Sequence, residues 1–254
     1  MGLGHHVDSL DFRTFDMTPF ALPTDYPRAR SVHSFAELVG TPFGSGVHAF
    51  CWERILLGDY AEVASALGTG DGEPIMALDE ALLRSLRMSS AGHMAVEQML
   101  ADWQLLRDHS LDPALNSIYG YPRDEDPGVV VTDVFSFHVD RAPFEASTYL
   151  CTYYGQPSEG LRHEDSFKRV DLPETREALL LAFGGGEGPD FREYLAEHCY
   201  DLHYAPTLGA KPFSFGLFNL WRLATDYPDS PVPPCVHRAP LTQPGDPPRL
   251  LLIS

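Results

Sequence analysis

A β-patterned run that ends in a His-x-Asp string is the feature that most constrains this chain. Residues 129–140 are rich in β-branched and aromatic side chains and close in His138-Val139-Asp140, which predicts a strand. Because side chains alternate along a strand, His138 and Asp140 are expected on the same face. An imidazole and a carboxylate so placed are two of the three ligands in the facial triad of non-heme Fe(II) oxygenases, which a second His completes.

The pattern of the whole chain predicts an α+β fold in one domain, residues 1–254. We expect residues 1–125 to be mostly helical and to pack on a β-barrel core, residues 126–254, that carries the metal site. The 22 Pro and 21 Gly residues suit a turn-rich β protein better than a helical bundle.

Individual elements follow from local spacing. Helices are expected at 58–67, with Asp59 as N-cap, and at 78–111, 174–183 and 190–199. Strands are expected at 46–52, 129–140, 147–154, 212–223, 236–241 and 249–253. Residues 1–46 are expected to form an arm around the domain, and residues 155–169 a polar loop.

Three His-x-Asp strings occur, and context separates them. His6-Val7-Asp8 lies at the terminus, and His163-Glu164-Asp165 lies in a charged segment typical of a solvated loop. With 11 His and 36 acidic residues, chance matches are expected. Only His138 ends a β-patterned run. A hydrogen-bonded polar pair at a strand end is the alternative interpretation of His138 and Asp140.

A late His and a late Arg strengthen the metal interpretation. His237 stands at the start of a predicted strand, and Arg249, twelve residues on, opens the next. Residues 242–248, rich in Pro and Gly, predict a turn between them. In Fe(II)- and 2-oxoglutarate-dependent enzymes, an Arg or Lys about that far past the distal His binds the remote carboxylate of the co-substrate. Thr152, on a predicted strand, is a candidate to bind the same co-substrate; core packing is its alternative role.

Several blocks together resemble a bacterial family of unknown function over residues 46–254. They are Val47-His-Ala-Phe-Cys-Trp-Glu-Arg54, Phe137-His-Val-Asp140, Leu150-Cys-Thr-Tyr-Tyr-Gly155, His237-Arg-Ala-Pro240 and Arg249-Leu-Leu-Leu252. The motif order of that family is similar to the Fe(II)/2-oxoglutarate-dependent dioxygenase superfamily. The resemblance implies a double-stranded β-helix, a jelly-roll or cupin-like barrel. One departure is Gly160, where the family has Trp, which leaves the substrate open and would widen the pocket.

Charge and composition narrow the partners. The formal net charge of −18 disfavours nucleic acid and anionic membranes, which require Lys and Arg on the surface. The start of the chain lacks the pattern of a signal peptide, and no apolar run approaches the roughly 20 residues that span a membrane. Four cysteines without a CxxC pair predict buried thiols in a reducing cytoplasm. The oligomeric state cannot be read from the sequence.

The sequence therefore predicts a cytoplasmic oxygenase that uses Fe(II), 2-oxoglutarate and O2 to hydroxylate, desaturate or cyclise a small molecule. His138, Asp140 and His237 would be its metal ligands and catalytic residues, and Arg249 and Thr152 would bind the co-substrate. An iron oxidase without 2-oxoglutarate is one alternative, with Arg249 on the carboxylate of the substrate. A non-catalytic zinc-binding or zinc-homeostasis protein is another. His198 and His203, which flank Asp201, are a weaker candidate for a second metal site.

Overall fold

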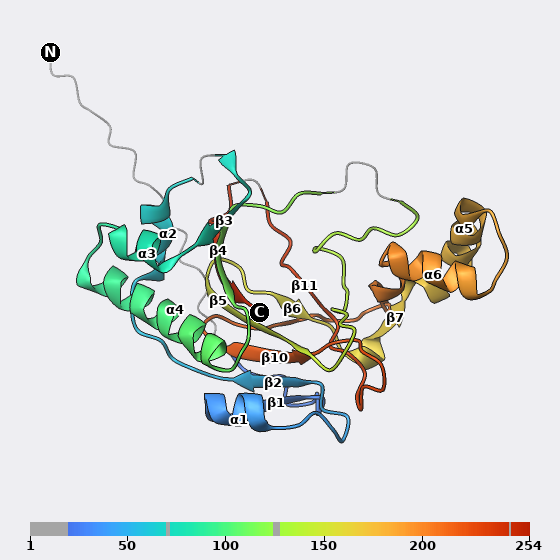
Figure 1. Ribbon diagram of the computed structural model, residues 1–254, viewed down its shortest axis with the longest axis horizontal. Coiled ribbons are helices and arrows are strands. Elements are labelled where there is room, and N and C mark those ends of the chain that lie inside the picture. Colours follow the sequence, from blue (N-terminus) through green and yellow to red (C-terminus); the bar gives the residue numbers. More distant parts are fainter. Residues whose placement is uncertain (1–19, 70–71, 124–127, 244) are drawn as a thin grey trace, which may run out of the picture.

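The computed structural model describes residues 20–69, 72–123, 128–243 and 245–254. A seven-stranded sheet runs through its centre in the order β1-β2-β10-β5-β12-β4-β3 (Figure 1). All neighbouring strands pair antiparallel except β1 and β2. The predicted α+β class is confirmed. The strands are β1 (Ala29–Val32), β2 (Ala49–Trp52), β3 (Ile75–Leu78), β4 (Ala114–Ile118), β5 (Ser147–Tyr154), β10 (Leu220–Ala224) and β12 (Arg249–Ile253).

Two smaller sheets hold the other strands of the described chain. One has the order β11-β6-β9, formed by β11 (His237–Arg238), β6 (Glu159–Gly160) and β9 (Phe213–Ser214). The other pairs β7 (Ser166–Lys168) with β8 (Tyr204–Pro206). Isolated bridges join His138 to His237 on one side and to His203 on the other. His138 therefore extends the first of these sheets beyond β11.

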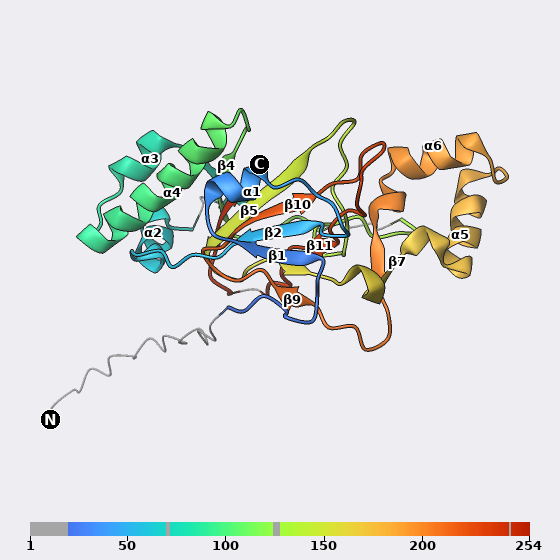
Figure 2. The ribbon, with the colours of Figure 1, turned by 90° about the horizontal axis from the view of Figure 1, so that it is seen from below.

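The helices gather at the two ends of the central sheet (Figures 1 and 2). One group comprises α2 (Tyr60–Leu67), α3 (Glu80–Ser85) and α4 (Ser90–Asp108), and the opposite end carries α5 (Pro173–Phe183) and α6 (Pro189–Glu197). The short α1 (Phe35–Gly40) follows β1. Side-chain oxygens of Asp59, Asp79 and Ser89 cap α2, α3 and α4 by accepting backbone N–H groups. The predicted N-cap at Asp59 is confirmed.

The central strand β5 separates two environments. Tyr149, Cys151 and Tyr153 belong to the main apolar core, which helices α1 to α4 cover. Leu150 faces the other way, into a second cluster that contains Phe215 of the segment after β9. This alternation is the period of two expected of a strand buried on both faces. The face that carries Leu150 is the one that also carries the candidate site.

The prediction of a strand at residues 129–140 is wrong. This segment is irregular, and within it only His138 makes β-bridges. The carboxylate of Asp133 accepts the backbone N–H groups of Phe135 (3.1 Å) and Ser136 (3.0 Å). An Asp that bonds its own following backbone favours a turn over a ladder, so the run breaks although its side chains are β-branched and aromatic.

Other boundaries also differ from the predictions. Residues 20–46 contain β1 and α1, and the first half of the chain supplies four strands of the central sheet as well as helices. The predicted strand 212–223 is divided into β9 and β10 because Gly216 and Phe218 both take positive φ, +69° and +71°. The predicted loop 155–169 holds β6 and β7. In the described part of the chain, the strands form separate sheets and no closed barrel.

Three cysteines are buried as predicted, namely Cys51, Cys151 and Cys235, whereas Cys199 is exposed, contrary to the prediction. None of the helices in the described ranges combines the length and the apolar character that a membrane crossing requires.

His48, the residue before β2, is fully buried and is held in its neutral form. Its Nδ1–H donates to the carbonyl of Pro233 (3.2 Å), and its Nε2 accepts from the hydroxyl of Tyr26 (2.8 Å). A carbonyl can only accept, so this pair of bonds defines one tautomer. Burial, partly opposed by the carbonyl of Pro233, lowers the pKa of His48 from 6.5 to about 4.

This depressed pKa predicts a loss of stability in mild acid. Below pH 6.5 the unfolded chain takes up a proton on His48 that the folded chain refuses until pH falls to about 4. His48→Gln removes this titration, so its free energy of unfolding should fall less than that of the wild type between pH 7 and pH 4.5, by about 2–3 kcal/mol. Urea unfolding of both proteins at the two pH values checks this. Equal losses in the two proteins would contradict it.

Candidate metal centre

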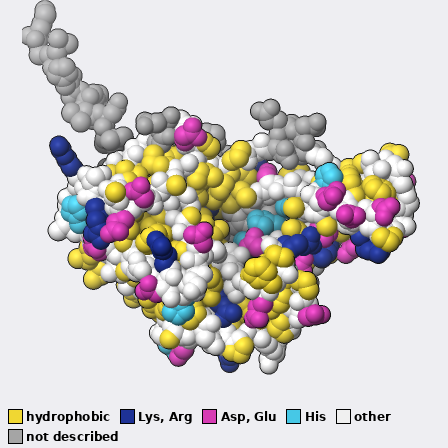
Figure 3. All heavy atoms as spheres, in the orientation of Figure 1, with side chains coloured by type: hydrophobic (Ala, Val, Ile, Leu, Met, Phe, Trp, Pro, Cys, Tyr) yellow, Lys and Arg dark blue, Asp and Glu magenta, His cyan; other side chains and the backbone are white. Residues whose placement is uncertain are grey.

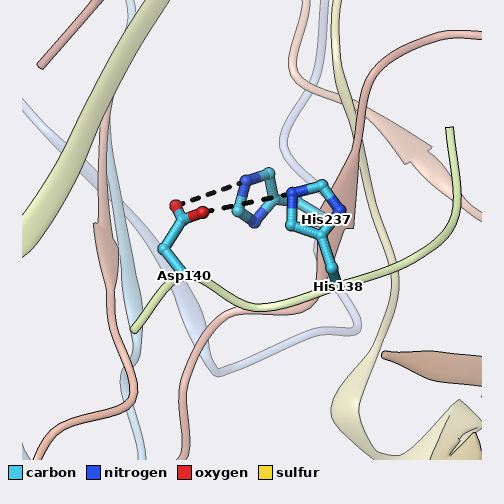
Figure 4. Close-up of side chains that lie close together, drawn as sticks. All are labelled: His138, Asp140 and His237. Atoms are coloured by element: carbon cyan, nitrogen blue, oxygen red, sulfur yellow. Dashed lines mark ion pairs between the residues drawn. The ribbon is translucent and has the colours of Figure 1, made fainter. Parts of the chain in front are cut away.

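The structure brings together His138, Asp140 and His237, three residues that the sequence proposes as ligands (Figure 4). One potential ligand atom from each lies within 4.8 Å of the others. Nε2 of His237 is 3.5 Å from Oδ2 of Asp140, and Nε2 of His138 is 4.0 Å from Oδ1. No other group of three His, Cys, Asp or Glu residues with this spacing occurs in the described ranges.

Backbone pairing places the two imidazoles side by side. The N–H of His138 donates to the carbonyl of His237 at 2.9 Å, and the N–H of His237 donates to the carbonyl of His138 at 2.9 Å. Residues that exchange both bonds across an antiparallel pair carry their side chains on the same face. The ring centroids are 4.8 Å apart.

Asp140 is held at the end of this short pairing by a second contact. The backbone N–H of Asp226, just after β10, donates to the carbonyl of Asp140 at 2.7 Å, and the N–H of Ala142 donates to the carbonyl of Asp226 at 3.0 Å. The chain on both sides of Asp140 is therefore fixed, although it is not part of a strand. His138 and Asp140 therefore lie close to each other, as the sequence predicts, although the segment that carries them is not a strand.

Both imidazoles present the same nitrogen to the carboxylate. Nδ1–H of His138 donates to the carbonyl of Ser136 at 2.8 Å, and Nδ1–H of His237 donates to the carbonyl of Cys235 at 3.1 Å. Because a carbonyl only accepts, each neutral ring keeps its lone pair on Nε2. Metal-ligating His residues are oriented in this way, with the other ring N–H on a carbonyl or carboxylate.

The protonation states also suit a cation. Burial raises the pKa of Asp140, but the electrostatic effect of the nearby His237 ring and a hydrogen bond from the hydroxyl of Thr148 outweigh this and leave that pKa lowered. Burial, then the charge of His237, lowers the pKa of His138. At neutral pH, Asp140 is therefore a carboxylate and His138 a neutral imidazole, the forms that bind metal.

The donor set and its spacing fit a metal ion closely enough to test. Ligands about 2.1 Å from one metal and at right angles to one another are about 3 Å apart. The two distances from Asp140 to the imidazoles, 3.5 Å and 4.0 Å, exceed this by 1 Å or less. Two imidazoles and one carboxylate are the ligands of non-heme Fe(II) sites and also of some zinc sites. The three side chains could therefore hold a metal ion.

Arg249 forms a second unusual feature on the same face of the central sheet. Its side chain is 1 % exposed, and its guanidinium contacts three hydroxyl groups: Tyr121 (3.0 Å), Ser158 (3.0 Å) and Thr152 (3.4 Å). Nε has no hydrogen-bond partner, and within the described ranges no carboxylate pairs with this cation. Burial lowers the pKa of Arg249 despite the opposing effect of Tyr121.

A buried cation without a counter-ion is costly, because the loss of hydration is not offset by an opposite charge. The hydroxyl groups around Arg249 cannot supply that charge. The position therefore has the properties of a site for a carboxylate, which a guanidinium binds through two parallel hydrogen bonds.

Strand β5 connects the two features. The hydroxyl of Thr148 contacts Asp140, and the hydroxyl of Thr152 contacts Arg249. Four residues of a strand span about 13 Å, and residues two or four apart share a face. The predicted co-substrate residues Arg249 and Thr152 are therefore in contact with each other. Strand β5 links them to the candidate metal ligands, because Thr148 of the same strand contacts Asp140.

Sequence reasoning did not identify Thr148, Tyr121 or Ser158. Thr148 could have been found, because it shares a face of β5 with Thr152. Tyr121 and Ser158 lie in irregular segments with no periodic signal. Arg238, which follows His237 on β11, pairs with Glu159 at 2.7 Å and takes no part in the group.

The remaining sequence candidates do not join this site. His163-Glu164-Asp165 forms a single 3-10 turn, and His6-Val7-Asp8 lies outside the described residues. The predicted widening of the pocket at Gly160 is wrong. A Cβ atom at this position would lie 2.3 Å from the ring of Phe213 and 2.7 Å from that of Phe215, so the two rings fill the space.

The site is open to solvent on one side. The side chain of His138 is 17 % exposed and that of Asp140 35 %, whereas His237 is 9 % exposed. Figure 3 shows histidine side chains in a hollow at the centre of one face, with basic and acidic side chains beside it. A small molecule can therefore reach this group of residues.

Comparisons with known proteins add no name to this geometry. No protein-family model, no curated protein and no solved structure matches the chain. The resemblance of its motifs to a dioxygenase-like family stays a prediction.

Removal of a ligand should abolish metal binding at this site. Asp140→Ala and His237→Ala should each lose the single bound Fe(II) of the wild type in anaerobic equilibrium dialysis. Thr148→Val, which removes the hydrogen bond to Asp140, should weaken binding about 10- to 100-fold. The matched control is His198→Ala, because His198 is an exposed His outside the group. If Asp140→Ala binds Fe(II) as tightly as the wild type, the metal centre is elsewhere.

Proposed function

We propose that this protein is a non-heme Fe(II)- and 2-oxoglutarate-dependent oxygenase that acts on a small molecule. One observation carries the proposal: Arg249, a buried cation to which the described residues provide no counter-ion, lies on the same face of the sheet as a His-Asp-His group. A chelating co-substrate with a second, remote carboxylate satisfies both features at once. Neither a metal-only site nor an anion-only site explains the two together.

The order of the strands supports a double-stranded β-helix. Four strands of the central sheet, in the order β4-β12-β5-β10, would face a second sheet in the order His138-β11-β6-β9. From β4 onward the chain alternates between the two sheets. The strands β4, β5, β10 and β12 lie in the central sheet, and the segments that follow the first three of them lie in the second sheet: His138 after β4, β6 and β9 after β5, and β11 after β10. This is the winding that the resemblance implies. The outer strands β1 to β3 and the helices would then be additions around a jelly-roll core.

The residues would divide the work as follows. His138, Asp140 and His237 would hold Fe(II), and the bound iron would supply the oxygen activation that protein side chains cannot perform. Carbonyls of Ser136 and Cys235 keep both imidazoles turned toward Asp140, and Thr148 holds its carboxylate. This fixed arrangement reduces the reorganisation needed when the metal binds.

Arg249 would orient the co-substrate. Its guanidinium binds the remote carboxylate of 2-oxoglutarate, and the hydroxyls of Tyr121, Thr152 and Ser158 hold that guanidinium in place. Because the side chain is buried, the ion pair forms away from water and is stronger than on the surface. The substrate would enter from the open side, and its structure decides among hydroxylation, desaturation and cyclisation.

The same cation also permits an oxidase without 2-oxoglutarate. In that case Arg249 would bind the carboxylate of the substrate itself, and the metal group would be unchanged. A zinc-binding protein without turnover would use the same three ligands but gives Arg249 no role. The three candidates therefore differ in what a 2-oxo acid does at the site.

Anaerobic spectroscopy separates them. Fe(II) and then 2-oxoglutarate are added to the purified protein under nitrogen, and the visible spectrum is recorded. We expect a charge-transfer band from the chelated 2-oxo acid. Arg249→Gln should weaken 2-oxoglutarate binding at least about 30-fold, since loss of one member of a buried charge pair costs 2 kcal/mol or more.

Arg238→Gln is the matched control, because Arg238 lies on the other face and pairs with Glu159. It should leave the band unchanged. Absence of the band, with zinc retained tightly instead, would favour the zinc-binding protein. Iron binding without any response to 2-oxoglutarate would favour the oxidase.

A further inference from the structure

A row of polar side chains continues the metal site across neighbouring segments. His138 pairs not only with His237 but also with His203 on its other side. The N–H of Val139 donates to the carbonyl of Leu202 at 3.0 Å, and the N–H of Tyr204 donates to the carbonyl of Phe137 at 2.8 Å. These bonds flank His138 and His203, so the two form a non-hydrogen-bonded pair with close side chains on the same face.

The row extends one segment further to Arg169. Strands β7 and β8 pair Lys168 with Tyr204, and the N–H of Arg169 donates to the carbonyl of His203 at 2.8 Å. The register therefore continues by one residue and places Arg169 beside His203. The order across the segments is Arg169, His203, His138, His237, with neighbours about one strand spacing, or about 5 Å, apart.

His203 is a buried side chain with an unused hydrogen-bonding group. It is 4 % exposed, and its Nδ1 is buried without a partner. The structure gives no hydrogen bond to its Nε2 in the described ranges either. Its ring lies 5.8 Å from that of His138, outside the three-residue metal group. A buried imidazole nitrogen without a partner costs free energy that a bound polar group would recover.

The side chain of Arg169 also carries an unsatisfied nitrogen. Its Nε is buried and unbonded, and no carboxylate pairs with it in the described part of the chain. Its guanidinium acts on His203. Burial first, and then the electrostatic effects of the His138 ring and of Arg169, lower the pKa of His203 to about 4. The acidic groups near His203 are already engaged, since Asp201 pairs with Arg141 and Asp133 accepts two backbone N–H groups.

We propose that Arg169 and His203 form a substrate subsite that binds a carboxylate of the substrate beside the metal centre. The guanidinium supplies the charge, and the neutral imidazole of His203 supplies one further N–H donor. This deepens the proposed function and rests on it, because it makes the substrate a small carboxylic acid. The two arginines would then have separate ligands: Arg249 the co-substrate and Arg169 the substrate.

The surroundings favour a carboxylate over a phosphate. The chain as a whole carries a net charge of −18, which repels anions unless a local cation attracts them. Asp133 and Asp201 lie close enough to His203 to oppose the lowering of its pKa by burial, His138 and Arg169. One guanidinium among these carboxylates suits a single negative charge better than the double charge of a phosphate monoester.

Nuclear magnetic resonance of the histidine rings tests the subsite directly. The protein is labelled with 15N in His, loaded with Zn(II) and saturated with 2-oxoglutarate, and sodium acetate is titrated as the smallest carboxylate with a carbon chain. We expect the ring nitrogens of His203 to shift and to saturate. Acetamide, the neutral counterpart of acetate, should leave them unmoved. His203→Gln, or His203→Asn if that variant does not fold, identifies the resonances.

Arg169→Gln should weaken the acetate response at His203 at least about tenfold, and Arg169→Lys less. Arg192→Gln is the matched control, because Arg192 is an exposed Arg on α6. If the His203 resonances do not move, or move equally in Arg169→Gln, the subsite is disproved. A response that is stronger with inorganic phosphate than with acetate would overturn the carboxylate assignment.

The same samples keep the two proposals distinguishable. Addition of 2-oxoglutarate before acetate should shift the resonances of His138 and His237. If these do not move while acetate still moves His203, the co-substrate assignment fails and the anion subsite stands. The opposite result retains the co-substrate and removes the subsite.

Discussion

The reciprocal backbone hydrogen bonds between His138 and His237 are the contact on which the candidate site depends. They join two short segments that lie far apart in the sequence, and they turn both imidazoles to one face. The carbonyls of Ser136 and Cys235 then select the tautomer. Because neither segment is a long strand, the site gains its order from these few bonds and from the contact of Asp140 with Asp226. A local change here would alter all three ligands together.

Strand β5 explains how one sheet serves both stability and function. On one face, Tyr149, Cys151 and Tyr153 enter the core under the helices. On the other, Thr148 reaches Asp140 and Thr152 reaches Arg249. The strict alternation of a strand thus separates the residues that hold the fold from those that hold the site. The buried charge of Arg249 is tolerated only because hydroxyl groups surround it, and it needs an anion for full compensation.

Local patterns predicted the parts of the fold that local chemistry decides. The helix after Asp59 and strand β5 lie where spacing and capping place them. The run before His138 was mispredicted because one side chain, Asp133, competes for its backbone. Spacing named the three residues of the metal group and Arg249, but Tyr121 and Ser158 lie in loops that carry no periodic signal. The pairing of His138 with His203 depends on a register between distant segments, which a single sequence does not encode in a readable pattern.

The most direct test of the account is a crystal structure of the protein with Zn(II), as a redox-inert substitute for Fe(II), and 2-oxoglutarate. We expect one metal ion about 2.0–2.2 Å from Nε2 of His138, Nε2 of His237 and an oxygen of Asp140. We also expect the remote carboxylate of 2-oxoglutarate on the guanidinium of Arg249. A metal ion bound elsewhere, or a 2-oxoglutarate molecule that leaves Arg249 without an anion, would contradict the account.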